Sequence, residues 1–451
     1  LPRTEGIHVD LPVMLFALAV SVAAGLVFSV VPVAAASRAA LHDRVRMRGM
    51  QGRRDQWARG GLVAAELGLA VILLTGAGLL GRSFLRVLSV APGFRTENVL
   101  TVRLRVPDER VASPFYPELL ERVANRPGVD SAAVSDCLPM EYVSGADLLP
   151  AGRAIDPAHL PTSDACFISA TYFRALGIPL LEGRAFGQRD GKDTMPVAVV
   201  SESVARQLWP GERAIGRRLA VNYRALGRPT ETAPQMREVV GVVADVRLHG
   251  LEAPSRMAVY LPYEQDATRR SLRAMVLFVR TASDPEPMAR SLQSDVRALG
   301  PDVPVLSVGT MNGSLRKTLA PRTFSLVLLG CFSAIALLLA AAGLYGVVSY
   351  AVARRVREIG IRMALGARRG DVLRSVLGQE LRWLAVGLLA GLAGASAIAR
   401  VLRGMLFGVE PGDPWTLACV IALLAAVAVA ACWNPANRAM RVDPLTALRE
   451  E

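Results

Sequence analysis

The sequence predicts an α-helical membrane protein of about five transmembrane helices, with a large two-lobed α/β domain outside the membrane. Apolar residues make up 52% of the 451 residues, a share that is high for a soluble protein. Several long windows carry no charge, and arginine-rich loops separate them. One long polar segment, in which strand and helix patterns alternate, interrupts the apolar windows. The length is enough for two or three domains.

Three charge-free windows are long enough to cross about 30 Å of hydrocarbon, which takes roughly 20 residues. They are residues 11–37, 323–353 and 414–437. Two weaker windows lie between them in sequence, at 62–81 and at 383–399, the second of which is short and rich in Gly and Ala. A buried helix of a soluble domain is the alternative for each weak window. Their position between strong windows favours membrane insertion.

The arginine content of the short loops predicts how the chain is oriented in the membrane. Residues 38–59 carry seven arginines against two aspartates, and residues 354–382 carry eight against three acids. The short loop before the last window instead carries Glu410 and Asp413. We therefore expect the arginine-rich loops and the C-terminus to face the cytoplasm, with residues of about 84–321 outside.

Three charged residues do not follow this simple pattern. Arg82 and Arg86 lie on the expected outer side, against the positive-inside rule. Glu66 is the one acid inside an expected span. A proton or ion relay would need partner groups in other spans, and their cores carry no acid, Lys or His. We expect Glu66 to reach the cytoplasmic interface or to pair with an arginine there.

The polar segment contains two β-α-β patterns that bracket an insertion. We therefore expect an α/β domain with one lobe split over residues 95–136 and 271–310, and a second lobe inserted at 137–270. The patterns are strand 98–106, helix 115–125 and strand 128–135, then strand 273–281, helix 285–300 and strand 302–308, with further strand signals at 195–201, 237–246 and 257–263.

The five cysteines fall into two groups. Cys331, Cys419 and Cys432 lie in apolar runs and are expected to be small buried hydrophobic residues. Cys137 and Cys166 lie in the polar segment. They can form a disulfide if that segment is outside the cytoplasm, but two cysteines alone do not decide whether they pair.

No complete set of motifs for nucleotide hydrolysis or other catalysis occurs in the sequence; Ser314–Lys317 matches S-x-x-K, but the companion motifs S-D-N and K-T-G are missing. The only Gly-Lys pair, Gly191-Lys192, is followed by Asp193, so the chain has no Walker-type phosphate loop. H-E-x-x-H, C-x-x-C and G-x-S-x-G are all missing, and the four histidines lack ligand spacing. We expect no catalytic residue, no metal site and no cofactor in this chain.

The net charge of +13 does not indicate nucleic-acid binding. The arginines cluster beside apolar runs, and no nucleic-acid-binding signature is present. Two sequences, at Gly387 and Gly391 and at Gly404 and Gly408, match the G-x-x-x-G motif of closely packed membrane helices. For the first of them, tight helix packing and an incidental pair of glycines both stay open.

Residues 354–367 are expected to form a short amphipathic helix on the cytoplasmic surface, between two spans. Val356, Ile359, Gly360 and Met363 fall at i, i+3, i+4 and i+7, which is one face of a helix. Arginines and Glu358 surround this face, and Gly366 can end the helix. Such a helix can rest on lipid headgroups or can dock a cytoplasmic partner, and the periodicity leaves both open.

The sequence resembles the FtsX/MacB-type ABC transporter permeases over nearly the whole chain from about residue 60. The match is carried by the stretches RRVREIGIRMALGARRGDVLRSVL, TYFRALGIPLLEGRAF, VSESVARQLWPGERAIGRRL and PANRAMRVDPLTALRE. Asn434 and Asn437 depart from the family pattern, which has an apolar and a basic residue there. The extra leading span resembles the duplicated-permease subfamily of acidobacteria, in which two permease units are fused.

The resemblance implies a division into four parts. These are 1–60, the last transmembrane helix of a preceding unit and a cytoplasmic linker; 61–86, a transmembrane helix; 87–321, a MacB-like periplasmic core domain; and 322–451, an FtsX-like permease domain with three transmembrane helices.

The resemblance also implies a mechanism, in which a separate cytoplasmic ABC ATPase dimer binds the helix at 354–367. ATP and Mg²⁺ would be held by that partner. Closure of the ATPase would push the helix and move the periplasmic domain, which is mechanotransmission. Ile359 and Met363 would enter a groove of the ATPase, with charged contacts around them. The residues expected at this contact are Arg354, Arg355, Val356, Glu358, Ile359, Gly360, Arg362, Met363, Leu365, Gly366 and Ala367.

The implied function is export of drugs, peptides or lipid-linked molecules from the bacterial inner membrane. The further partners would be the lipid bilayer and a periplasmic adaptor or a second permease unit. An FtsX-like signalling protein that activates a periplasmic cell-wall hydrolase is the alternative. The large external segment favours the MacB-like branch. A membrane-anchored enzyme is disfavoured because the catalytic motifs are missing.

Overall fold

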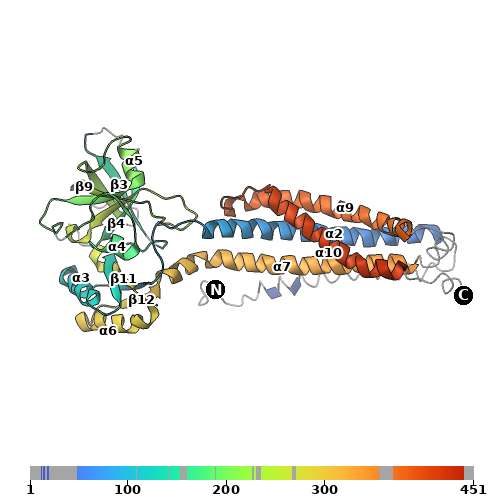
Figure 1. The fold of residues 1–451 in the computed structure, drawn as a ribbon, viewed down its shortest axis with the longest axis horizontal. Coiled ribbons are helices and arrows are strands. Elements are labelled where there is room, and N and C mark those ends of the chain that lie inside the picture. Colours follow the sequence, from blue (N-terminus) through green and yellow to red (C-terminus); the bar gives the residue numbers. More distant parts are fainter. Residues whose placement is uncertain are drawn as a thin grey trace. The chain divides into compact units, whose positions relative to one another are not determined.

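The computed structural model describes residues 48–107, 109–141, 143–152, 160–187, 189–225, 228–229, 235–266, 271–354 and 369–440, and a few positions between 12 and 19. The predicted span at 11–37 lies almost wholly outside these residues. The chain divides into two compact units. We call Leu1–Arg86 with Pro321–Glu451 the helical unit, and Val87–Ala320 the outer domain (Figure 1).

Long helices form the helical unit. They are α2 (Arg48–Leu88), α7 (Met311–Arg354), α9 (Arg369–Val401) and α10 (Pro414–Met440). Within the described residues, four stretches are long and apolar enough to cross a membrane: Gly60–Leu88, Met311–Ser349, Arg382–Gly404 and Pro414–Trp433. Both weak windows of the sequence therefore belong to helices of membrane-spanning length. The predicted count of five stays a prediction.

The helical unit is apolar both inside and outside. Its core holds Leu67, Val71 and Leu424. Leu338 and Leu389 are 70% and 67% exposed on the surface of the same unit. A surface of this kind is suited to lipid. We expected the cysteines of the apolar runs to be buried. This expectation was wrong for Cys331 and Cys419, which are exposed. The apolar surroundings that the sequence indicated for them are on the outside of the helices.

The outer domain is built on one 12-stranded sheet. In chain order the strands are β1 (Val99–Arg105), β2 (Val129–Ser135), β3 (Ser144–Pro150), β4 (Thr162–Ile168), β5 (Leu180–Gly183), β6 (Val197–Ser201), β7 (Arg218–Ala225), β8 (Arg228–Pro229), β9 (Gln235–Val243), β10 (Ala258–Pro262), β11 (Ala274–Thr281) and β12 (Val305–Thr310).

Four strands in the order β2-β11-β1-β12 form the sheet lobe. The antiparallel pairings leave β1 and β2 parallel with β11 between them, and β11 and β12 parallel with β1 between them. The connections are α3 (Glu109–Ala124) and α6 (Ala289–Leu299), which pack against each other. Asp295 on α6 is buried and accepts a 2.7 Å hydrogen bond from Arg126, which follows α3. Two interleaved β-α-β units thus share one sheet.

The remaining lobe is a closed ring of six strands, β10-β6-β9-β7-β3-β4, which a parallel pairing of β10 with β4 completes. We call it the ring lobe. Alternate residues of its strands, such as Phe167, Val200 and Leu261, are buried in the hydrophobic core of the domain. The helix α5 (Glu202–Leu208) packs against β6, β9 and β10 of the ring, while α4 (Tyr172–Leu176), which follows β4, packs against β2 and β11 of the sheet lobe. Closure leaves few free strand edges, and β5, which pairs with β9 beside the ring, is one of them.

Candidate functional site

The predicted ATPase-contact segment lies outside the described residues, apart from Arg354, where α7 ends. The next described helix, α9, begins at Arg369. The segment therefore connects the ends of two helices that each contain a stretch of membrane-spanning length. Its helical conformation and its contacts stay predictions.

Glycines let α2 and α9 pack so closely that their backbones are in contact. A Cβ added at Gly391 would lie 2.7 Å from the Cβ of Val71 and 3.0 Å from the Cα of Gly68. A Cβ at Gly387 would lie 2.6 Å from the carbonyl oxygen of Ala64. Real side chains do not approach so closely, so both positions require glycine. The G-x-x-x-G pair at 387 and 391 therefore packs tightly, while Gly404 has no neighbouring atom within 4 Å.

Glu66 on α2 faces α7. A Cβ added at Gly343 would collide with the Oε2 atom of Glu66. This oxygen is buried and has no hydrogen-bond partner within the described part of the chain. The arginine partner that we expected for Glu66 is not found among those residues. The tight fit shows instead that α2 and α7 are in contact at this level.

Arg82 of α2 pairs with Asp413 in the loop between α9 and α10. Asp413 also caps α10, because its Oδ2 accepts hydrogen bonds from the backbone N–H (3.0 Å) and the hydroxyl (2.6 Å) of Thr416. The Thr416 hydroxyl, followed by its N–H and Arg82, lowers the pKa of Asp413. The Ser83 hydroxyl accepts a 2.8 Å hydrogen bond from the Phe407 N–H. The ion pair with Asp413 explains why Arg82 is tolerated on the expected outer side of the membrane.

We expect Arg82→Gln to destabilise the helical unit by about 1 kcal/mol, because it leaves a half-buried carboxylate without its cation. The lowered pKa of Asp413 means that this stabilisation is present at neutral pH and is lost as the pH falls through that value. Thermal unfolding in detergent measures the effect. Asp413→Asn keeps the cap of α10 and removes the charge. The double variant Arg82→Gln/Asp413→Asn should therefore be only slightly less stable than Arg82→Gln alone. Additive losses would contradict a direct pairing.

The outer domain receives the chain from α2 through residues 92–95, which are held by α4 on the sheet lobe and by the loop after β9 of the ring lobe. The Pro92 carbonyl accepts a 3.0 Å hydrogen bond from the Arg247 N–H, and the Arg95 N–H donates one of 2.8 Å to the Leu176 carbonyl. Gly93 has a φ of 85° and packs against the backbone of Asp245. This entry segment is thus fixed to α4 and to the loop after β9.

The chain leaves the outer domain through β12 of the sheet lobe. Thr310, the last residue of β12, is followed directly by α7, and its hydroxyl accepts a 3.1 Å hydrogen bond from the Gly313 N–H. No loop separates the strand from the helix, which begins well before the apolar window predicted at 323. The entry segment therefore contacts both lobes, while the chain leaves through the sheet lobe.

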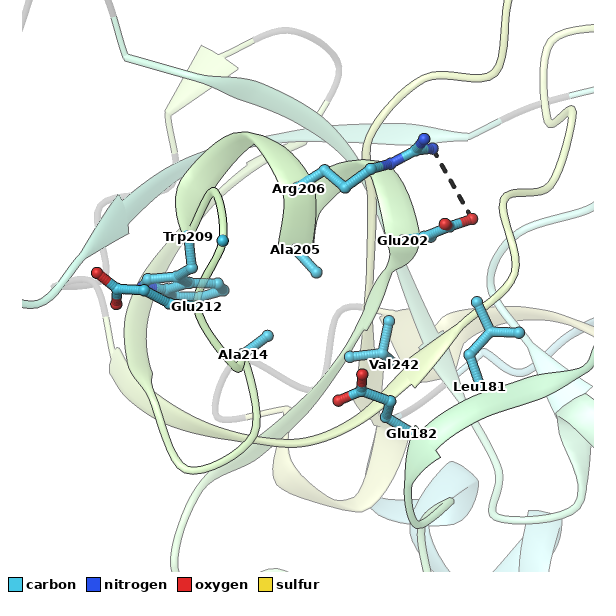
Figure 2. A pocket seen from close by; sticks show the side chains of 10 residues that line it. Leu181, Glu182, Glu202, Ala205, Arg206, Trp209, Glu212, Ala214 and Val242 are labelled. Carbon is cyan, nitrogen blue, oxygen red and sulfur yellow. Dashed lines mark ion pairs between the residues drawn. The ribbon is translucent and has the colours of Figure 1, made fainter.

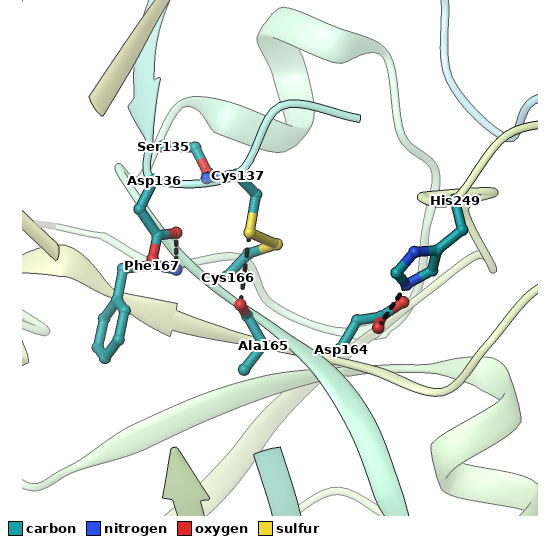
Figure 3. Close-up of a disulfide and its surroundings, with 8 residues drawn as sticks. All are labelled: Ser135, Asp136, Cys137, Asp164, Ala165, Cys166, Phe167 and His249. Atoms are coloured by element: carbon teal, nitrogen blue, oxygen red, sulfur yellow. Dashed lines mark hydrogen bonds and ion pairs between the residues drawn. A yellow bond between two sulfur atoms is a disulfide. The ribbon is translucent and has the colours of Figure 1, made fainter. Parts of the chain in front are cut away.

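The two lobes meet where β2 and β4 pair through a single residue pair, Ser135 and Ile168. A disulfide between Cys137 and Cys166 lies beside this junction, with Cα atoms 5.6 Å apart (Figure 3). Asp136 and Phe167 exchange hydrogen bonds of 3.2 and 2.8 Å. The disulfide settles the pairing that the sequence left open. Such a bond is typical of proteins outside the cytoplasm.

Comparisons with known proteins identify the family of the chain. The family described as MacB-like periplasmic core domain matches residues 62–295, more than half of the chain, and the family described as FtsX-like permease C-terminal matches residues 308–444. Similar proteins include a macrolide export ATP-binding/permease protein MacB of Sodalis glossinidius, 27% identical over 81% of this chain and 52% of its own length. A pyoverdine export ATP-binding/permease protein PvdT of Pseudomonas aeruginosa is 28% identical over 61% and 40%.

The chain thus spans about half or less of the length of these relatives. Among solved structures, the periplasmic region of MacB from Actinobacillus actinomycetemcomitans matches 51% of this chain and 95% of its own, with 15% identity and a TM-score of 0.33. The extracellular domain of the noncanonic ABC-type transporter YknZ from Gram-positive bacteria matches 46% and 100%, with 16% identity and a TM-score of 0.29.

Proposed function

Because this chain belongs to the family of permeases with a MacB-like periplasmic core domain and an FtsX-like C-terminal part, we propose that it is the membrane subunit of an ABC transporter. A separate cytoplasmic ATPase binds ATP and Mg²⁺. The permease turns the closure of that ATPase into movement of its outer domain, which lies in the periplasm. The substrates are drugs, peptides or lipid-linked molecules. The names of the MacB and PvdT relatives, which refer to export, support this class.

One observation carries the proposal more than any other. The helix α7 begins where the last strand of the outer domain ends, at Met311, and ends at Arg354, the first residue of the predicted contact segment. At 1.5 Å per residue, a helix of 44 residues is about 66 Å long. A push on the segment after Arg354 therefore acts on the helix whose other end is joined directly to β12. Pro321 lies within this helix and is a natural position for it to bend.

The packing of the helical unit provides a second path by which movement of the contact segment can reach the outer domain. The segment after Arg354 leads into α9, which the glycine contacts hold against α2. On the expected outer side, Arg82 and Asp413 tie α2 to the start of α10. α2 leads to the entry segment, which is bound by α4 on the sheet lobe and by the loop after β9 of the ring lobe. In this proposal α7 acts on the sheet lobe through β12 and α2 acts on both lobes through the entry segment, so that the outer domain is moved at two separate attachments.

The proposal predicts that Ile359→Asp combined with Met363→Asp lowers recovery of the ATPase at least tenfold. Two carboxylates on the apolar face would have to be buried in the groove of the partner without a compensating charge. The measurement is co-purification of the full chain with co-expressed ABC ATPases of the same organism. Ile361→Asp is the matched control, because residue 361 would lie on the opposite face of the predicted helix. Equal recovery with the double variant and the control would count against the proposal.

A further inference from the structure

The outer domain has a cleft between the short edge strand β5 and the helix α5 (Figure 2). Its volume is about 340 Å³. Leu181 and Glu182 of β5 form one wall, and Ala205 and Trp209, from α5 and the residue after it, form the other. Arg206, which also lines the cleft, pairs at 3.3 Å with Asp245, the residue that packs against Gly93 of the entry segment. The cleft has no part in the function proposed above.

One wall of the cleft offers open backbone hydrogen-bonding groups. Across the described residues β5 pairs with β9 alone, in the register Leu180 to Val243 and Glu182 to Val242. Its other edge is free, and Leu180 and Leu181 are 42% and 48% exposed. An exposed edge with apolar side chains is a template on which another strand can add.

The bottom of the cleft is apolar. Trp209, Ala214 and Val242 line it and are 7%, 3% and 4% exposed. Ala205 is small and half-buried, so the opposite wall leaves room for a side chain. An aliphatic chain that enters here would be covered on several sides. The volume suits one long side chain rather than a bulky ring system.

The rim of the cleft is acidic although the whole chain carries a net charge of +13. Three glutamates and one arginine line it. Each glutamate has an arginine nearby: Glu202 lies 3.8 Å from Arg206, Glu212 lies 2.6 Å from Arg217, and Glu182 lies 3.9 Å from Arg213. All of these side chains are well exposed, so the pairs contribute little and can exchange for a ligand cation.

We propose that this cleft binds an extended basic peptide segment of a periplasmic partner protein. The segment adds as a strand to the free edge of β5. One Arg or Lys side chain enters the cleft, with its aliphatic stem over Ala205, Ala214 and Trp209, and its charged end among the three glutamates. The backbone gives affinity and the acidic cleft selects the side chain. The inference rests on the proposed function only for the location of the domain in the periplasm.

The test uses the full chain in detergent and fluorescein-labelled peptides, with binding measured by fluorescence anisotropy. The first probe is Ac-Thr-Val-Arg-Val-Thr-NH2, and its matched counterpart has Glu in place of Arg. Two further probes carry the Arg sequence with N-methyl groups on alternate residues, one in each register. We expect saturable binding of the Arg peptide, at least tenfold weaker binding of the Glu peptide, and at least tenfold weaker binding of one N-methylated peptide.

Two variants with the same substitution locate the site. Ala205→Phe fills the cleft and is expected to weaken binding of the Arg peptide at least tenfold. Ala298→Phe places the same side chain at an exposed position of α6, in the sheet lobe, and is expected to leave binding unchanged. Because the assay contains no ATPase, its result is independent of the test of the coupling helix.

Several results would overturn the proposal. Equal binding of the Arg and Glu peptides would remove the role of charge. Full binding of both N-methylated peptides would indicate a site for small organic cations instead of strand addition. Unchanged binding by Ala205→Phe would place the peptide elsewhere. A doubling of the particle mass that Ala205→Phe abolishes would assign the cleft to a second copy of the chain.

Discussion

Replacing Cys137 and Cys166 together by serine is expected to lower the free energy of unfolding of the outer domain by about 3–4 kcal/mol. The disulfide closes a loop with a sequence separation of 29, and the loss of this restraint in the unfolded chain accounts for an effect of that size. It also lies beside the single residue pair that joins the sheets of the two lobes. Its removal should therefore loosen the lobe junction more than other parts of the domain.

Chemical unfolding of the full chain, followed by tryptophan fluorescence, measures this difference. Reduction of the wild type should have the same effect as the double substitution. The control is Cys331→Ser with Cys419→Ser, because both of these thiols are free and exposed on the helical unit. An equal stability of the Cys137/Cys166 variant and the control would contradict a structural role for the disulfide.

Gly391→Leu is expected to destabilise the helical unit by about 3 kcal/mol or more, at or above the upper end of the usual cost of overpacking. The new side chain would meet the Cα and the carbonyl oxygen of Gly68, each 3.0 Å from its Cβ. Backbone atoms of a membrane helix cannot rotate aside as the end of a flexible side chain can, so α2 and α9 would have to separate.

Thermal unfolding of the full chain in detergent tests this prediction. The matched control is Gly346→Leu, because Gly346 also lies in a membrane-length helix and no atom lies within 4 Å of an added Cβ there. We expect the control to be close to the wild type in stability. Equal stability of the two leucine variants would show that the contact between α2 and α9 is not tight.

The sequence was informative wherever its pattern was local. The apolar windows predict the membrane-length helices because hydrocarbon requires long runs without charge, and α10 begins at Pro414 as the window does. The strand β1 was predicted because apolar and polar residues alternate within it, and β11 because the same order of strand and helix patterns recurs there. The strand β3 was missed, since Ser144–Pro150 contains Gly, Asp and Pro, which are rare in strands. Ring closure was also missed, because it depends on pairings between distant strands.

The candidate sites show the same limit. The contact segment after Arg354 was found through its helical periodicity and its resemblance to a family, both of which are local in sequence. The position of Arg82, which departs from the positive-inside rule, could not be explained from the sequence because its partner Asp413 is 331 residues away. The acidic cleft was not foreseen, since Leu181, Ala205 and Val242 come from three elements and show no common pattern. A fold is needed before such residues can be seen together.

The central claim is that a separate ATPase moves the outer domain of this chain. It is tested most directly by a distance between nitroxide labels at Ala298→Cys and Gly412→Cys, with Cys331, Cys419 and Cys432 replaced by serine, in liposomes that contain the partner ATPase. We predict that the distance distribution shifts between the nucleotide-free and vanadate-trapped states, and that Ile359→Asp with Met363→Asp abolishes the shift. Identical distributions in both states, while the bound ATPase hydrolyses ATP, would contradict the claim.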